Sequence, residues 1–204
     1  MTKIAVVGAP SSGKTVLARR LTNTLSLLGY GADSAIEYAR TYLFRYVKPA
    51  ARQSQDLLDQ VMIYLGQRRR EEDLRHCDFV VCDSATFLPY VFACFWGFDL
   101  KDPRDVMVVH KLFKWSLEEI ATYDFIFHIP PRLDYKPKAK AWKVSTKDER
   151  ADIARRIEDY LLNARVPHHD VTGDTPETRE KFVLDVLAKK VDGLRDRLAK
   201  HARG

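Results

Sequence analysis

Short apolar runs alternate with longer segments of helical periodicity along this chain, without internal repeats or low-complexity linkers. The short runs are typical of buried strands, and the longer segments place apolar residues on one helix face. The predicted strands are 3–7, 31–36, 78–82, 124–129 and 168–171. The predicted helices are 14–28, 37–46, 53–76, 86–96, 103–121, 148–164 and 176–200. This order predicts an α/β fold, in which helices cover both faces of a parallel five-stranded sheet.

A phosphate-binding sequence follows the first predicted strand. It reads Gly8-Ala9-Pro10-Ser11-Ser12-Gly13-Lys14-Thr15, and a predicted helix comes next. This is the pattern Gly-x-x-x-x-Gly-Lys-Ser/Thr in its required context, where glycines let backbone N–H groups converge on phosphates. Lys14 would add a cation to the β- and γ-phosphates, and the Thr15 hydroxyl is the expected magnesium ligand. The sequence therefore predicts binding of a nucleoside triphosphate, taken as ATP, with Mg²⁺.

Two carboxylates are predicted to lie near this loop, because each follows a strand of the sheet. Asp83 ends an apolar strand, where ligands bind in open α/β sheets, and is expected to assist the metal or to cap a helix. Glu37 could accept a proton from an attacking hydroxyl, or form a capping box with Ser34. Arg40, one helical turn further on, could hold an anionic substrate or pair with Glu37.

A long predicted helix carries polar residues at helical spacing. They are Gln60, Tyr64, Arg68 and Glu71. This face is expected either to line an acceptor pocket or to face water.

A lysine-rich segment at about 130–150 is predicted to form a lid over the site, because structureless runs of this length are usually functional. Its cationic residues are Arg132, Lys136, Lys138, Lys140, Lys143, Lys147 and Arg150. Arg150, at the start of a helix, is the first candidate for stabilising charge on the transferred phosphate, with Arg155 and Arg156 as alternatives. Trp142 could stack on a base or pack the lid shut.

The turn after the last predicted strand reads Thr172-Gly173-Asp174 and is expected beside the nucleotide base. The preceding His168 and His169 are interpreted as strand residues rather than metal ligands.

Composition adds limits to this picture. A chain of 204 residues fits one α/β domain, 1–204, and its three cysteines are interpreted as reduced core thiols. The net charge of +6 is clustered, which would suit phosphorylated or polynucleotide partners, although the basic tail is more simply a solvated helix face. No stretch fits a signal peptide or a membrane span, so a cytoplasmic location is expected.

Taken together, several segments resemble the P-loop kinase/ATPase family typified by the ribosylnicotinamide kinase domain, whose stand-alone members are often phage-encoded. These segments are Gly8–Thr15, Glu37-Tyr38-Ala39-Arg40, Gln60 with Arg68, Cys82-Asp83-Ser84, Tyr123-Asp124 and Arg150. The resemblance implies strand order 2-3-1-4-5 and phosphotransfer from magnesium-ATP to a hydroxyl. It also implies that Glu37, Arg40, Gln60 and Arg68 face the acceptor, Asp83 the metal or acceptor, and Arg150 the lid.

The lid departs from that family, since residues 130–136 read Pro130-Pro131-Arg132-Leu133-Asp134-Tyr135-Lys136 where a short acidic or Asp-Gly-Arg segment is usual. A lysine-rich lid favours a more anionic acceptor. The leading hypothesis is a kinase acting on a nucleoside or nucleotide. One alternative is a kinase acting on a hydroxymethylated pyrimidine in phage DNA, with DNA bound through the basic patches, Arg132 and Trp142. Another is a regulatory ATPase; the sequence contains no Asn-Lys-x-Asp guanine motif, which argues against a GTPase.

Overall fold

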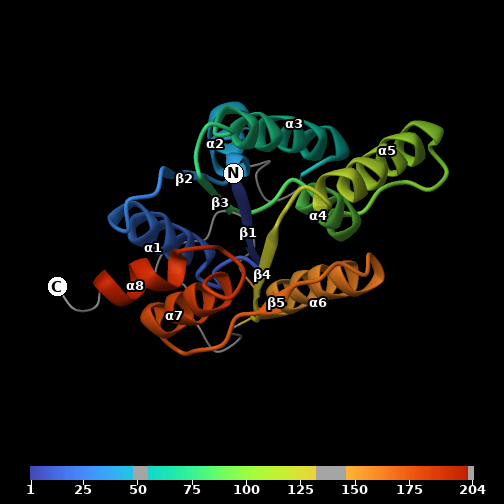
Figure 1. Cartoon of the computed structure of the whole chain (residues 1–204). Coiled ribbons are helices and arrows are strands. Elements are labelled where there is room, and N and C mark those ends of the chain that lie inside the picture. The colour runs from blue at the N-terminus through green and yellow to red at the C-terminus, as the bar shows by residue number, and fades with distance from the viewer. Residues whose placement is uncertain (48–54, 132–145, 202–204) are drawn as a thin grey trace.

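Five parallel strands form a central sheet (Figure 1). The computed structural model describes residues 1–47, 55–131 and 146–201. The strands are β1 (Thr2–Gly8), β2 (Ala32–Ala35), β3 (Phe79–Asp83), β4 (Phe125–Ile129) and β5 (His169–Asp170). Their order is β2-β3-β1-β4-β5, and each neighbouring pair is parallel. The predicted fold class and strand order are confirmed.

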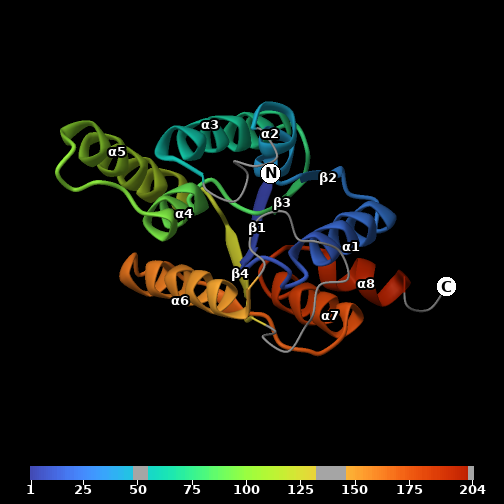
Figure 2. The same cartoon turned by 180° about the vertical axis from the view of Figure 1, so that it is seen from behind.

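Helices cover both faces of this sheet. The described helices are α1 (Lys14–Leu27), α2 (Tyr38–Tyr46), α3 (Leu57–Asp73), α4 (Leu88–Trp96), α5 (Pro103–Ile120), α6 (Lys147–Asn163), α7 (Pro176–Leu187) and α8 (Leu194–His201). Both views place α1, α7 and α8 together on one side, and α4 and α6 on the other (Figures 1 and 2).

The alternation of side chains along β1 divides the core into two layers. Ile4 and Val6 pack with the apolar residues of α1 and α7. Ala5 and Val7 pack with those of α4 and α6. All four are completely buried, as expected for the middle strand of a parallel sheet covered on both faces.

Two helices differ most from the sequence-based expectation. The last predicted helix, 176–200, is divided into α7 and α8, and Gly193 between them has a φ of +73°. Such a backbone cannot continue a right-handed helix. The helix expected from residue 53 begins as α3 at Leu57, after a capping box formed by Asp56 and Asp59. The expected start itself lies outside the described residues.

The cysteines agree in part with the prediction of reduced core thiols, because Cys82 is buried whereas Cys77 and Cys94 are half-buried. Cys77, Cys82 and Cys94 are free thiols, and Cys82 is fully buried. None of the described helices combines the length and the apolar character needed to cross a bilayer.

Candidate nucleotide and acceptor site

The phosphate loop lies between β1 and α1, as predicted. Gly8 has a φ of +150°, and a Cβ at this position would lie 2.6 Å from the carbonyl oxygen of Ile129 on β4. Gly13 has a φ of +100° and is the N-cap of α1. Both positions therefore require glycine. The Lys14 Nζ donates to the carbonyl oxygen of Ala9 at 2.9 Å, so the loop curls around its own lysine.

Glu37 is joined to the phosphate loop through Arg40. The Arg40 Nε donates to Glu37 Oε2 at 2.7 Å, and its Nη2 donates to the Thr15 hydroxyl at 3.0 Å. The expected capping box with Ser34 is not formed, because Ser34 lies in β2 and Glu37 itself is the N-cap of α2. The Glu37 carboxylate is consequently held beside the predicted magnesium ligand.

Asp83 is a buried carboxylate at the end of β3. The residue is 2 % exposed, and neither carboxylate oxygen has a hydrogen-bond partner among the described residues. Burial raises the pKa of this carboxyl, and the nearby Thr15 hydroxyl and Lys14 ammonium oppose that rise only in part. The alternative role as a helix cap is wrong, because α4 begins at Leu88 with Phe87 as its N-cap.

These residues fit a magnesium ion. A buried carboxylate without hydrogen-bond partners is stabilised by a nearby cation, and Mg²⁺ needs few protein ligands when phosphates and water supply the rest. Thr15 and Asp83 would hold it, and it would neutralise charge on the phosphates. Within the described ranges, no group of three or more His, Cys, Asp and Glu side chains could hold a metal by itself.

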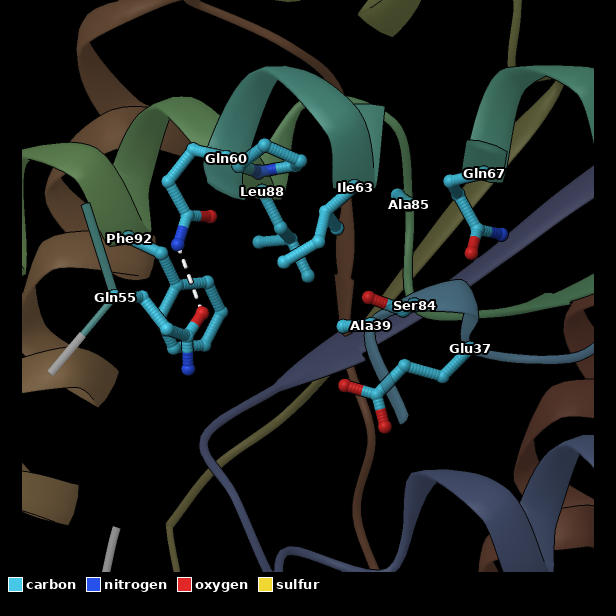
Figure 3. Close-up of a pocket in the computed structure, with 11 residues that line it drawn as sticks. Glu37, Ala39, Gln55, Gln60, Ile63, Gln67, Ser84, Ala85, Leu88 and Phe92 are labelled. Carbon is cyan, nitrogen blue, oxygen red and sulfur yellow. Dashed lines mark hydrogen bonds between the residues drawn. The ribbon is translucent and has the colours of Figure 1, made fainter. Parts of the chain in front are cut away.

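A pocket opens next to Glu37 (Figure 3). It is surrounded by α2, α3, α4 and the loop after β3. Its lining residues are Glu37, Ala39, Gln55, Gln60, Ile63, Gln67, Ser84, Ala85, Leu88, Pro89 and Phe92. Gln60 Nε2 donates to Gln55 Oε1 at 2.8 Å, and these two amides lie at the opposite end of the pocket from Glu37 (Figure 3).

Three further predicted site residues, Arg68, Arg150 and Gly173, are not among the lining residues of this pocket. Arg68 is absent from the described lining of the pocket, and its Nε instead lies 3.0 Å from Glu72 and 3.1 Å from Glu119. Arg150 is 7 % exposed in the first turn of α6. Gly173 has a φ of +113°, and a Cβ there would lie 2.5 Å from the Thr178 hydroxyl.

Part of the predicted lid cannot be placed. Arg132, Trp142 and the lysines from 136 to 143 lie outside the described residues. Their roles stay predictions, as does the binding of DNA that was partly based on them.

Sequence reasoning missed several residues. Gln55 and Gln67 line the pocket although neither was selected, and Leu88 and Phe92 form part of its apolar wall. The spacing of Gln60, Gln67 and Glu71, all nearly completely buried, marks the inward polar face of α3. Of the four residues selected from the sequence, Gln60, Tyr64 and Glu71 are buried, and only Arg68 lies at the exposed edge of this face.

The comparisons with known proteins agree with this architecture. A family model described as an AAA domain matches residues 3–179. No curated protein matches the chain.

Solved structures share the fold at low sequence identity. NadR protein in complex with NR aligns with a TM-score of 0.69 and 17 % identity, over 94 % of this chain and 51 % of that chain. NadR in complex with NAD and AMP-PNP aligns with a TM-score of 0.66 and 19 % identity, over 92 % and 49 %. Deoxyadenosine kinase from M. mycoides with bound dATP aligns with a TM-score of 0.65 and 14 % identity, over 92 % and 100 %.

The chain therefore spans about half the length of the NadR chains that it matches. The resemblance inferred from the sequence is confirmed for family and fold, and the phosphate loop implies binding of a nucleoside triphosphate. Since the family model covers most of its length, the chain belongs to the AAA domain family.

Proposed function

We propose that this protein is a magnesium- and ATP-dependent kinase that transfers the γ-phosphate to a hydroxyl group of a nucleoside or nucleotide. The observation that carries the proposal is the position of Glu37, which lines the pocket and is linked through Arg40 to Thr15 of the phosphate loop. A pocket for an acceptor and a loop for a triphosphate thus share one wall. The fold shared with deoxyadenosine kinase and with NadR bound to NR supports the same class of reaction.

Each candidate residue of the site has a separate chemical task in this proposal. Glu37 accepts the proton of the attacking hydroxyl or orients that hydroxyl. Lys14 balances charge on the phosphates, and Thr15 and Asp83 would hold a magnesium ion that would supply further charge compensation there. Arg150 is the candidate cation for the transferred phosphoryl group. Phosphoryl transfer demands mostly positioning and charge compensation, which is the kind of chemistry these groups perform.

The pocket suits an acceptor with a planar ring and polar edges. Leu88, Phe92 and Ile63 offer apolar surface, whereas the side-chain amides of Gln55 and Gln60 offer both donors and acceptors. Small-molecule sites usually combine apolar walls with a few polar groups that fix orientation. A nucleobase bound between these residues would direct its sugar hydroxyl towards Glu37.

A transfer assay with labelled ATP tests the proposal. Purified protein is incubated with magnesium, γ-labelled ATP and separate panels of nucleosides, nucleotides and hydroxymethylated DNA. We expect label in a nucleoside or nucleotide, no transfer by Lys14→Ala, and a turnover by Glu37→Gln that is about 100-fold lower at similar ATP affinity. Glu158→Gln, an exposed residue on α6, is the matched control and should be unchanged.

Three results would contradict the proposal. Label found only in DNA would favour the DNA kinase, and ATP hydrolysis independent of every acceptor would favour a regulatory ATPase. Transfer by Lys14→Ala at the normal rate would refute the assignment of the phosphate loop.

A further inference from the structure

Glu71 is a buried glutamate on α3 that the chemistry above does not use. The residue is 4 % exposed, and its carboxylate accepts hydrogen bonds from three side chains. Lys3 Nζ lies 2.9 Å from Oε2, the Tyr123 hydroxyl donates at 2.8 Å to Oε2, and Gln67 Nε2 donates at 3.0 Å to Oε1. Burial raises the pKa of this carboxyl, while Lys3 and the two donors act in the opposite direction. A carboxylate buried this deeply is stable only when cations and hydrogen-bond donors replace the water that its oxygens have lost.

The first branch of this network reaches the turn that carries Glu37. The backbone N–H of Tyr38, the residue after Glu37, donates to Gln67 Oε1 at 2.8 Å. Arg70 on the same helix donates to the carbonyl oxygen of Ile36 at 3.0 Å. A Cβ at position 66 would overlap the Tyr38 ring, so a glycine is needed where this turn packs on α3.

The second branch reaches the loop that follows Asp83. The backbone N–H of Thr86 donates to the Tyr123 hydroxyl at 2.9 Å, and the Thr86 hydroxyl lies at the same distance. That tyrosine hydroxyl uses its single proton for Glu71, so both bonds to Thr86 depend on the position of the phenol. The same loop includes Ser84, whose φ of +91° is unusual for a residue with a side chain.

We propose that Glu71 is a positioning residue, which holds the Glu37 turn through Gln67 and the Asp83 loop through Tyr123 and thereby fixes the two carboxylates of the site relative to each other. The inference rests on the proposed kinase function for its consequence in turnover. Its structural content is independent of that function, because the network consists only of contacts between residues of this chain. Displacement of a reacting group by about 1 Å can lower a rate by about 100-fold, so a remote anchor of this kind can control turnover.

Glu71→Gln tests the central carboxylate. The three partners of Glu71 described above are all donors, so an amide would place its own donor against at least one of them. Native-state amide exchange of the ligand-free variant should be about tenfold faster or more at both Tyr38 and Thr86. Tyr123→Phe should accelerate exchange at Thr86 but leave Tyr38 much less affected, and it serves as the second test if Glu71→Gln does not fold.

The chain supplies a matched control for each variant. Glu119 is also a buried glutamate that accepts from a tyrosine, Tyr64, and pairs with an arginine, Arg68. Tyr160 is also a buried tyrosine, and its hydroxyl donates to Ser116 at 2.8 Å. We expect Glu119→Gln and Tyr160→Phe to leave exchange at Tyr38 and Thr86 within about twofold of the original, because neither contact belongs to the two branches.

Turnover then separates positioning from general stability. With an accepted substrate, Glu71→Gln and Tyr123→Phe should lower kcat by about 10- to 100-fold, with the KM for ATP within about twofold. Equal losses of kcat in the controls would overturn the proposal, as would a uniform rise of exchange across the protein or unchanged exchange at both Tyr38 and Thr86. If no acceptor is phosphorylated by the unaltered protein, the kinase assignment fails, and the exchange experiment still decides the role of Glu71.

Discussion

Asp83 is expected to reduce the stability of the ligand-free protein at neutral pH. Its carboxylate is buried, and burial raises its pKa although the Thr15 hydroxyl and the Lys14 ammonium oppose that rise. A raised pKa means that the folded protein binds the proton more tightly than the unfolded chain does. The folded state therefore loses stability as the pH rises from below the unfolded pKa through the folded pKa. Above both values the full penalty is present, which is consistent with the proposed role of Asp83 in holding a cation.

Asp83→Asn should accordingly raise the melting temperature without nucleotide at pH 7 while abolishing phosphoryl transfer. A rise of about 2–4 °C is expected, which is what 1 kcal/mol produces in a chain of this length. The difference should disappear at acidic pH, where Asp83 is protonated in both states. Thermal unfolding at the two pH values measures this, with Asp159→Asn on the exposed surface of α6 as the control. A lower melting temperature at pH 7 would show that Asp83 has a stabilising partner.

Sequence reasoning at the scale of single residues succeeds where neighbours in the chain define the environment. Gly8, Gly13 and Lys14 belong to one continuous loop, and their geometry follows from their spacing. The functions of Gln67 and Arg68 depend on a different quantity, namely how α3 is rotated against the sheet. Adjacent helix positions differ by about 100°, so one residue lines the pocket and the next reaches Glu119.

At the scale of elements, α8 contacts the C-terminal end of α1. Gly193, directly before α8, has a positive φ. Leu194, the first residue of α8, is completely buried in the core. Arg197 donates to the carbonyl oxygen of Leu28 at 2.8 Å, and its guanidinium lies 4.2 Å from the centroid of the Tyr30 ring. Carbonyl groups at a helix end lack intrahelical partners, so this arginine satisfies one of them. The charge pattern of the tail suggested only a solvated helix, because the contact joins residues 169 positions apart.

Arg197→Ala should therefore destabilise the protein by about 1–2 kcal/mol, from the loss of a charged hydrogen bond and of a cation–π contact. Arg195→Ala is the matched control, since both arginines are exposed on the same helix. Urea unfolding of both variants, with an unchanged m-value, isolates the difference. Equal stability of the two variants would mean that the contact of Arg197 with the end of α1 does not stabilise the protein.

At the scale of the whole molecule, the strand order is predictable because it is typical of the phosphate-loop family. Since β1 and β3 are parallel neighbours, their C-terminal ends lie at the same edge of the sheet. The meeting of distant segments at that edge is not predictable in the same way. Arg179 on α7 is an example. Its Nη1 donates to the carbonyl oxygen of Ser12 at 2.8 Å, and its Nε donates to the carbonyl oxygen of Gly173 at 2.9 Å. One side chain thus joins the phosphate loop to the turn expected beside the nucleotide base.

Arg179→Ala should weaken binding of ATP while leaving the acceptor unaffected. Without the two charged hydrogen bonds, the phosphate loop and the Gly173 turn lose their common support, and we expect the KM for ATP to rise by about tenfold. The KM for the acceptor should stay constant, because the pocket lies between α2, α3 and α4. Lys181→Ala, which removes an exposed cation of α7 paired with Asp185, controls for the loss of charge. A similar rise in both KM values would indicate a general loosening of α7. A rise limited to the KM for ATP would show that Arg179, by joining the phosphate loop to the Gly173 turn, supports nucleotide binding.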